Sequence, residues 1–435
     1  MKTLLKNAKT NQFLIDGSVD KEIIVDVLIS NQKIEKISED KIEDSGAKII
    51  DAKNYYLTPG LCDPQVHFRE PGMEYKEDIE SGSRAAVKGG FTTVISMPNT
   101  SPTADNFETV SFMRNKSKEI GICRVLPTGA VTMGLKGMEL APFSDLKKAG
   151  AIALTDDGKG VQSDEIFFKA MEMAAKLNLP ILDHSEDESL SLGGAIHKGE
   201  ISKKYDLAGI DSDSESAHVK RGCDFSEKTN CHYHVLHIST KKSIDYVREA
   251  KKRGIRVTAE VSPHHLLLCD EDIPEREEGM LNPNWKMNPP LRSKEDRAEC
   301  VKALLDGTID AIATDHAPHA PNEKEKHISD APFGIIGLET AFPLIYTNFV
   351  KTKKLSFIKC IDLMSKNAGA LFGLEMGRLE PGAMADLCLF DLENEFKVNT
   401  EFFASKSKNS PFIGQRLFGE TKLTLFEGNI VYNNL

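Results

Sequence analysis

The stretch Asp63-Pro64-Gln65-Val66-His67-Phe68-Arg69-Glu70-Pro71-Gly72 is the part of the chain on which the interpretation of the fold depends. The apolar residues before it, 57–62, predict a buried strand that ends in a polar tip. If the strand continues, alternation puts Asp63, Gln65 and His67 on one side. A histidine at a strand tip, followed by an arginine and a Pro-Gly turn, suggests a metal ligand beside an anion-binding group. A single histidine is more often an ordinary polar residue, so a metal site requires ligands from elsewhere in the chain.

The size and composition of the chain limit the classes of protein to which it can belong. At 435 residues it exceeds the usual size of one hydrophobic core, which favours a large domain and a smaller one. Its net charge of -11 argues against a nucleic-acid or acidic-membrane partner. The sequence has no long apolar run and no pattern typical of a signal peptide. Its eight cysteines include no C-x-x-C pair, so we expect a protein of the reducing cytoplasm.

From residue 57 onward, strand-like runs alternate with helical patterns. The runs lie near Leu61 and at 91–97, 122–126, 151–155, 180–183, 233–238, 255–261 and 310–314. The helical patterns cover 77–88, 107–118, 164–177, 242–252 and 293–305. Eight strands are the number that closes a (β/α)8 barrel of the TIM type. The alternative is an open doubly wound sheet, but polar residues follow many of the strands rather than one switch point, which favours the barrel.

The two chain ends have a different pattern, of short strands with little helical periodicity. We therefore expect an α/β protein in which a barrel over residues 57–372 is joined by a small β-sandwich. Residues 1–56 and 373–435 would build this sandwich together. The Gly- and charge-rich stretch 189–215 is expected to form an insertion on the catalytic face.

Residues able to bind zinc follow four further strands. They are Asp156 or Asp157, His184, His237 and Asp315. Because barrel enzymes keep their sites at the carboxyl ends of the strands, we expect these side chains to converge with His67. Asp156 and Asp157 face opposite sides of an extended chain, so at most one of them reaches the site directly.

The remaining histidines near the strands have simpler interpretations. His232 and His234 are out of phase with His237, and we predict that they face the helix layer as structural residues. His264 and His265 follow the seventh strand and are not expected to bind a metal themselves.

Two histidines combined with carboxylates suit a pair of divalent ions bridged by a carboxylate. Water between two such ions is deprotonated near neutral pH and attacks an amide-like carbonyl. Asp315, after the last strand, is placed to take the proton and pass it to the leaving nitrogen.

The substrate side of the predicted site is rich in cationic and amide side chains. Arg69 is two residues from His67, Asn99 ends the second strand, and His319 follows Asp315 by four residues. Asn288 lies in a proline-rich run. An arginine with Asn and His donors suits a small-molecule carboxylate substrate. For Arg69 the alternative is a surface ion pair with Glu70 or Glu74.

Six motifs together resemble those of a known family. They are HFREPG at 67–72, MPNT at 97–100, TDDG at 155–158, HIST at 237–240, KMNPPLR at 286–292 and ATDHAPH at 313–319. The set is similar to that of the class I bacterial dihydroorotases, which belong to the amidohydrolase superfamily. The similarity runs nearly end to end, through GLETAF at 337–342 to NSPF at 409–412.

This resemblance implies the reversible, zinc-dependent cyclisation of N-carbamoyl-L-aspartate to L-dihydroorotate in pyrimidine synthesis. By position it implies a metal set of His67, Asp157, His184, His237 and Asp315, with Asp157 as the bridge and Asp315 also as the catalytic acid and base. It implies that Arg69, Asn99 and His319 hold the substrate carboxylate, while Asn288 and the backbone of Phe333 and Gly334 contact the ring. Related dihydropyrimidinases and hydantoinases bridge their metals with a carboxylated lysine, so Asp157 favours the dihydroorotases over them.

Gln65 departs from the family pattern, which has histidine there. Zinc prefers nitrogen and sulfur ligands, then carboxylate oxygen, and an amide is a poorer ligand. The resemblance therefore implies one or two zinc ions, with the α site, at His67, the weaker one. The primary hypothesis is an active dihydroorotase. The alternative is a weakly active or inactive subunit that partners an aspartate transcarbamoylase, and a homodimer is also compatible with the family.

Overall fold

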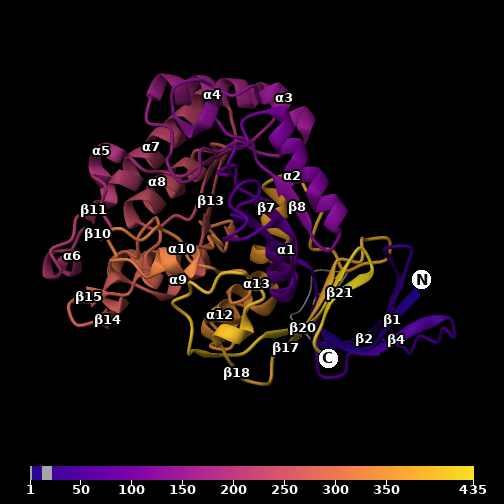
Figure 1. The fold of residues 1–435 in the computed structure, drawn as a ribbon. Coiled ribbons are helices and arrows are strands. Elements are labelled where there is room, and N and C mark those ends of the chain that lie inside the picture. Colours follow the sequence, from indigo (N-terminus) through magenta and orange to yellow (C-terminus); the bar gives the residue numbers. More distant parts are fainter. Residues whose placement is uncertain (1, 12–21) are drawn as a thin grey trace.

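Parallel strands form the centre of the computed structural model, which describes residues 2–11 and 22–435 (Figure 1). These strands are β6 (Leu61–Val66), β7 (Phe91–Ser96), β8 (Arg124–Pro127), β9 (Ile181–Asp183), β12 (Tyr233–Val235), β13 (Val257–Val261) and β16 (Ala311–Ile312). They pair in two sheets, in the orders β6-β7-β8 and β16-β13-β12-β9.

Single bridges join the two sheets into a barrel. Leu154 pairs with Gly129 after β8 and with Ile181 of β9, so it belongs to the fourth strand. Val66 pairs with His316, and the His67 N–H donates to the His316 carbonyl at 2.8 Å. The predicted barrel is therefore present. Its fourth strand runs over residues 152–155, within the predicted 151–155: the Gly129 N–H donates to the Ala153 carbonyl at 3.0 Å, and the Leu182 N–H donates to the Leu154 carbonyl at 2.9 Å.

Helices cover the outside of the barrel (Figure 1). The longer ones are α1 (Ile79–Lys88), α2 (Phe107–Ile120), α3 (Phe143–Ala149), α4 (Asp164–Leu177), α7 (Ser212–Thr229), α8 (Lys241–Lys252), α10 (Lys294–Asp306) and α13 (Phe357–Met364). The five predicted helices lie within two residues of these bounds. Each begins at a polar residue whose side chain accepts from a first-turn N–H, which satisfies an amide that has no partner within the helix; these caps are Asp78, Asn106, Ser163, Thr240 and Ser293.

Short helices and strands lie mainly in the connections. They are α5 (Glu188–Ser191), β10 (Ile196–His197), α6 (Glu200–Lys204), β11 (Gly209–Ile210), α9 (Pro263–Leu267), β14 (Glu275–Glu277), β15 (Met280–Leu281), α11 (Pro321–Lys324), α12 (Ala341–Ile345), α14 (Lys366–Ala370), β18 (Phe396–Lys397) and β19 (Arg416–Leu417). The elements from α5 to β11 follow β9, so the predicted insertion lies on the carboxyl side of the barrel strands. Among the described residues, every helix is too short or too polar to span a lipid bilayer.

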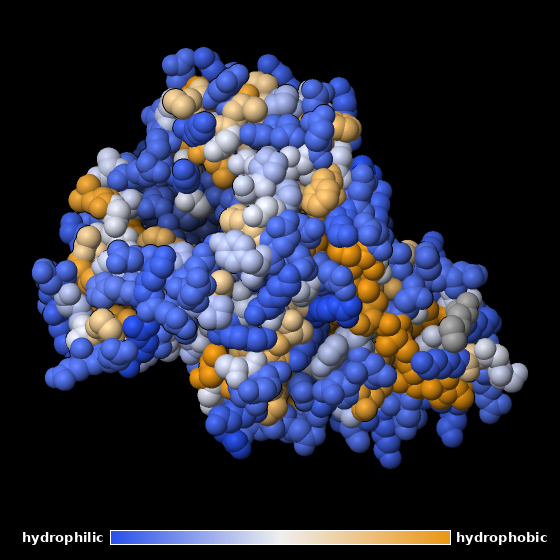
Figure 2. Space-filling model, viewed as in Figure 1, coloured by the Kyte–Doolittle hydropathy of each residue, from blue (hydrophilic) through white to orange (hydrophobic). Residues whose placement is uncertain are grey.

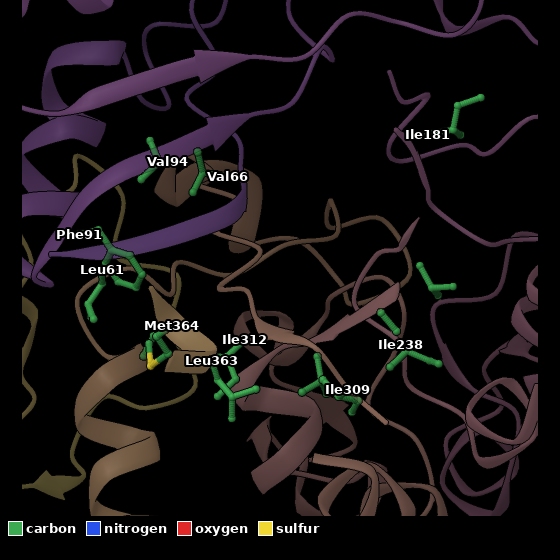
Figure 3. Packing of buried hydrophobic residues seen from close by; sticks show 14 of the residues in the cluster. Leu61, Val66, Phe91, Val94, Ile181, Ile238, Ile309, Ile312, Leu363 and Met364 are labelled. Atoms are coloured by element: carbon green, nitrogen blue, oxygen red, sulfur yellow. The ribbon is translucent and has the colours of Figure 1, made fainter. Parts of the chain in front are cut away.

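Alternating side chains of the strands pack outward against the helices and inward on one another. Figure 3 shows Val66 and Val94 side by side on β6 and β7, and Leu363 and Met364 of α13 near Ile312. A second cluster fills the barrel itself and includes Cys62, Ile95, Ala153, Leu182, Leu236 and Ala311. This packed interior leaves the ends of the strands as the place for a cavity.

His234 faces the inside of the barrel, so its predicted position against the helices is wrong. Its ring nitrogens lie 2.8 Å from Thr258 Oγ1 and 3.0 Å from Glu260 Oε2, and His232 Nε2 also lies 2.8 Å from Thr258 Oγ1. The alternation does not extend to His237 because β12 ends at Val235 and His237 has a φ of 31°. His232 shares the Thr258 hydroxyl with His234, so it also faces inward and its predicted position against the helices is wrong too. The hydrogen bonds of both histidines support their prediction as structural residues.

The strands of both chain ends form one further sheet beside the barrel (Figure 1). Within the described residues its members are β1 (Lys2–Thr10), β2 (Ile23–Ser30), β3 (Lys33–Ser38), β4 (Ala47–Asp51), β5 (Tyr56–Pro59), β17 (Leu387–Asp391), β20 (Glu420–Phe426) and β21 (Asn429–Asn433). The two ends meet where β5 pairs antiparallel with β17. Side chains of both ends, such as Leu5, Val27, Leu389 and Leu425, share one apolar core. The fold is therefore a (β/α)8 barrel with a small β-sandwich built from both chain ends. Figure 2 shows a mostly hydrophilic surface, with an apolar band across this end sheet.

Candidate active site

The carboxyl ends of the barrel strands surround a cavity of about 180 Å³. It is lined by His67, Arg69, Asn99, Asp157, Gly158, His184, His237, Asn288, Asp315, Ala317, His319, Phe333 and Gly334. All the residues that the sequence predicts for the metal, the catalytic acid and base, and the substrate are in this set. The structure therefore brings together side chains that are up to 267 positions apart in the sequence.

One oxygen of Asp157 faces two histidines from neighbouring strands. Asp157 Oδ1 lies 3.3 Å from His184 Nδ1 and 3.7 Å from His237 Nε2, and these two nitrogens are 3.0 Å apart. All three side chains are buried, and their ligand atoms lie within 4.8 Å of one another. Two imidazole nitrogens and a carboxylate oxygen converging in this way fit a divalent metal such as zinc.

The other oxygen of Asp157 faces a second group. Asp157 Oδ2 lies 3.1 Å from His67 Nε2, which is also 3.2 Å from Asp315 Oδ1. Gln65 Nε2 donates to the same Asp157 Oδ2 at 3.2 Å, while Gln65 Oε1 is buried with no hydrogen-bond partner. Gln65 thus donates an N–H to Asp157 Oδ2. This N–H cannot bind a metal, and it contacts the oxygen that a second metal would use as a ligand. Only rotation of its amide would present the oxygen instead.

The electrostatics of the group favour charged histidines around a charged carboxylate. Burial lowers the pKa of His67 and His184, but Asp157 and the other carboxylates outweigh it and raise the pKa to about 9 and about 10 respectively. Burial also raises the pKa of Asp157, but the three surrounding histidines hold it well below its ordinary value. A metal ion that binds here has to displace these protons, so its affinity depends on pH.

The ring nitrogens that point away from Asp157 also have partners. His67 Nδ1 lies 2.9 Å from Asn99 Oδ1, and His184 Nε2 lies 3.2 Å from Glu186 Oε2. The same Glu186 oxygen accepts from Asn288 Nδ2 at 2.7 Å. Carboxylates that bind the second nitrogen of a ligating histidine fix its orientation. Glu186 lies two residues after His184 at the same strand end, but its role was not predicted from the sequence.

Three residues of the cavity other than glycine have backbone conformations in the left-handed region. The φ angles are 60° at Arg69, 31° at His237 and 50° at Asp315. Such conformations are typical of functional sites and persist only where neighbouring contacts hold them. Buried acids hold the backbone near two of them, Asp315 and His237: Asp63 accepts from the Thr314 N–H at 3.0 Å, and Glu215 accepts from the N–H groups of Ser239 and Thr240 at 3.1 and 3.0 Å.

Two aspartates near the cavity are turned away from it. Asp156 Oδ1 accepts from the N–H groups of Val131 and Thr132 at 2.8 and 3.0 Å, so only Asp157 of this pair enters the site, as expected. Asp63 accepts from the Thr314 N–H instead of lining the cavity with His67. The pairing of β6 with β7 is irregular between Asp63 and Val66, which interrupts the predicted alternation.

Arg69 is buried at the cavity wall. Its Nε donates to the Pro318 carbonyl at 3.3 Å, and in the described part of the chain its guanidinium has no ion pair. Glu70 accepts from the Ile79 N–H, and Glu74 accepts from the Gly72 N–H. The alternative interpretation of Arg69 as a surface ion pair is therefore wrong. A buried guanidinium with free donors is suited to a carboxylate ligand.

His319 and Gly334 lie next to Arg69 in the cavity lining. His319 Nε2 donates to the Phe333 carbonyl at 2.7 Å. Gly334 has a φ of 132°, and a Cβ there would lie 2.7 Å from the Ala317 Cβ and 2.8 Å from the Ala317 carbonyl oxygen. Only glycine fits at this position, so the peptide after Phe333 can lie directly against the strand end.

Comparison with known proteins identifies the family. A family model described as Dihydro-orotase-like matches residues 55–243. The dihydroorotase of Brevibacillus brevis is 51% identical over 412 residues, which cover 94% of this chain and 96% of that protein. The chain belongs to the dihydroorotase family.

Two further comparisons agree with this assignment. The dihydroorotase of Geobacillus kaustophilus is 52% identical over 394 residues and 91% of each chain. Among solved structures, the L-hydantoinase (dihydropyrimidinase) from Arthrobacter aurescens has a TM-score of 0.85 at 26% identity, covering 99% of this chain and 96% of the other. The barrel and the end sheet are thus an arrangement shared with this hydrolase.

Proposed function

We propose that the chain is an active dihydroorotase, which catalyses the reversible ring closure of N-carbamoyl-L-aspartate to L-dihydroorotate in pyrimidine synthesis. The observation that supports this best is the arrangement around Asp157. Its two oxygens face two groups of ligand atoms, and Arg69 lines the same cavity. The relatives reported above, named dihydroorotases, support the choice of substrate.

Zinc is the proposed cofactor, held firmly by Asp157, His184 and His237. A second, weaker site would use the other oxygen of Asp157 with His67 and Asp315. The N–H that Gln65 directs at this oxygen opposes a second ion, so we propose that one zinc per chain is held tightly. When bound, the metal supplies a Lewis acid that polarises the carbonyl and lowers the pKa of water.

Asp315 is the proposed acid and base. In ring opening, water adds to the ring amide carbonyl carbon while Asp315 takes a proton from the water. Asp315 then donates this proton to the ring nitrogen as the C–N bond breaks, which leaves the ureido group and a carboxylic acid that releases its own proton to solvent as it ionises. Ring closure runs through the same steps in reverse and releases water.

Arg69, Asn99 and His319 are proposed to hold the substrate carboxylate. Asn288 and the backbone of Phe333 and Gly334 would contact the ring. The small cavity suits a single ring, and its buried guanidinium requires an anionic group on the ligand.

Substrate selectivity tests this proposal. We expect the purified protein to hydrolyse L-dihydroorotate but not dihydrouracil, which has the same ring without the carboxylate. Arg69→Met should lower kcat/KM for dihydroorotate by roughly 100-fold, the size of effect expected when a charged hydrogen-bonding group is lost. Equal turnover of both rings, or an Arg69→Met variant with unchanged kcat/KM, would contradict the assignment of the carboxylate site.

We propose domain boundaries at 1–56, 57–372 and 373–435, and a cytoplasmic location. The proposed assemblies are a homodimer and a complex with an aspartate transcarbamoylase. Light scattering on the chain alone, and mixed with a purified transcarbamoylase, tests both assemblies.

A further inference from the structure

Lys324, the last residue of the short helix α11, is a buried cation outside the predicted site. Its residue is 5% exposed. The ammonium donates to the carbonyls of Pro283, Lys286 and Pro332 at 3.0, 3.1 and 2.8 Å. All three of its N–H donors therefore have acceptors, and none of these is a carboxylate.

The three carbonyls belong to two different loops of the cavity wall. Pro283 and Lys286 precede Asn288, whereas Pro332 precedes Phe333 and Gly334. The Lys286 carbonyl also accepts from the Gly334 N–H at 3.0 Å. Lys324 and this backbone bond thus connect the loop that carries Asn288 to the loop that carries Phe333 and Gly334.

A second lysine strengthens the same connection. Lys286 Nζ donates to the Ser329 carbonyl at 3.0 Å and lies 4.3 Å from the centroid of the Phe333 ring. His319 holds the Phe333 carbonyl from the other side. The peptide on each side of Phe333 is therefore anchored by a cationic or imidazole side chain.

The charge of Lys324 has no direct counter-ion in the described residues. Its neighbour Glu323 is directed instead to Lys76 Nζ at 3.0 Å. Burial, together with Lys286 and Arg69, lowers the pKa of Lys324 to about 7. A buried cation of this kind is costly to maintain, and an apolar side chain of similar length would avoid that cost. The three hydrogen bonds to carbonyls are the interaction that a lysine provides at this position and an apolar side chain would not.

We propose that Lys324 is a positioning residue for substrate binding, because its ammonium fixes the distance between the Asn288 loop and the Phe333–Gly334 loop. The inference rests on the proposed function, since these loops are taken to contact the ring of the substrate. Lys324 itself does not line the cavity, so it acts through the residues it holds.

Steady-state kinetics of Lys324→Met test the proposal. This substitution keeps the length of the side chain and removes the three donors. We expect KM for L-dihydroorotate to rise at least about tenfold, the equivalent of one lost charged hydrogen bond, with kcat within about threefold of the wild type. Zinc content should remain at the wild-type value. Lys326→Met, two residues away on the exposed surface, is the matched control and should change neither constant.

Hydrogen exchange at the Gly334 amide provides a readout that does not depend on turnover. Exchange should accelerate in Lys324→Met and not in Lys326→Met. If Lys324→Met does not fold, Lys324→Arg takes its place, because it keeps the charge but not the fit to three carbonyls; it should raise KM with kcat unchanged. Unchanged KM and unchanged Gly334 exchange in the folded variant would overturn the inference. Absence of turnover in the wild type would instead contradict the proposed function, and the exchange result would still decide the role of Lys324.

Discussion

Replacing Glu186 by glutamine should weaken zinc binding at Asp157, His184 and His237. One oxygen of Glu186 contacts both His184 Nε2, at 3.2 Å, and Asn288 Nδ2, at 2.7 Å. Burial raises the pKa of Glu186, but His184 and Asn288 outweigh this and lower it to about 2, so the group is a carboxylate at neutral pH. Glutamine is nearly the same size but neutral.

The size of the effect follows from the contacts that are lost. A hydrogen bond to a charged group contributes roughly 1.5–3 kcal/mol. The glutamine oxygen can still accept from one partner, so we expect about one such contribution to disappear. Since about 1.4 kcal/mol corresponds to a factor of ten, zinc affinity should fall roughly 10- to 100-fold, as is typical when a carboxylate behind a ligating histidine is removed.

Competition with a chromophoric zinc chelator at fixed pH measures this change. Glu188→Gln, in which an exposed carboxylate two residues further on loses its charge, serves as the matched control. Unchanged affinity in Glu186→Gln, or an equal loss in Glu188→Gln, would refute the argument that Glu186 orients His184.

Three further predictions concern the same group of residues. Gln65→His should allow a second zinc ion to survive dialysis, measured by elemental analysis; retention of one ion in both proteins would show that Gln65 does not limit the second site. Asp315→Asn should lower kcat by roughly 10²- to 10⁴-fold while KM changes little, since general acid–base catalysis contributes about this much; a normal kcat would mean that another residue is the base. In the folded protein the pKa values of His67 and His184 are raised to about 9 and about 10, so protonation of these histidines stabilises the chelator-treated fold. This stabilisation is complete below about pH 6.5, the ordinary pKa of histidine, and is lost as the pH rises through the two raised values. The difference in Tm between zinc-loaded and chelator-treated protein should therefore widen between about pH 6.5 and 10; a constant or narrowing difference would contradict this.

The barrel and most of its ligands could be predicted because both depend on regular geometry. In a closed parallel barrel the carboxyl ends of all strands meet at one rim. His67, His184 and Asp315 therefore converge whatever the conformation of the loops. The same holds for the helices, whose polar caps are visible in the sequence as single residues before each periodic run.

Side-chain directions near the strand ends were harder to predict because regular alternation stops there. The strand β12 ends before His237, so side chains do not alternate without interruption from His234 to His237. Counting alternate residues back from His237 therefore places His234 on the wrong face of the strand. An irregular pairing in β6 likewise directs Asp63 to Thr314. Periodicity holds only while the strand is regular.

The supporting residues in loops could not be predicted from pattern at all. Glu186 lies outside any strand, and Lys324 belongs to a run of charged residues that is typical of a solvated surface. Both are informative only once their partners, Asn288 and the three carbonyls, are known from the structure. For Gln65, the sequence alone showed that glutamine replaces the family histidine, but its contact with Asp157 is known only from the structure.

Turnover of L-dihydroorotate by the purified wild-type protein, with zinc content measured on the same sample, tests the central proposal most directly. We predict turnover accompanied by at least one tightly held zinc ion per chain. Absence of both turnover and bound metal, under conditions where Gln65→His gains both, would contradict it.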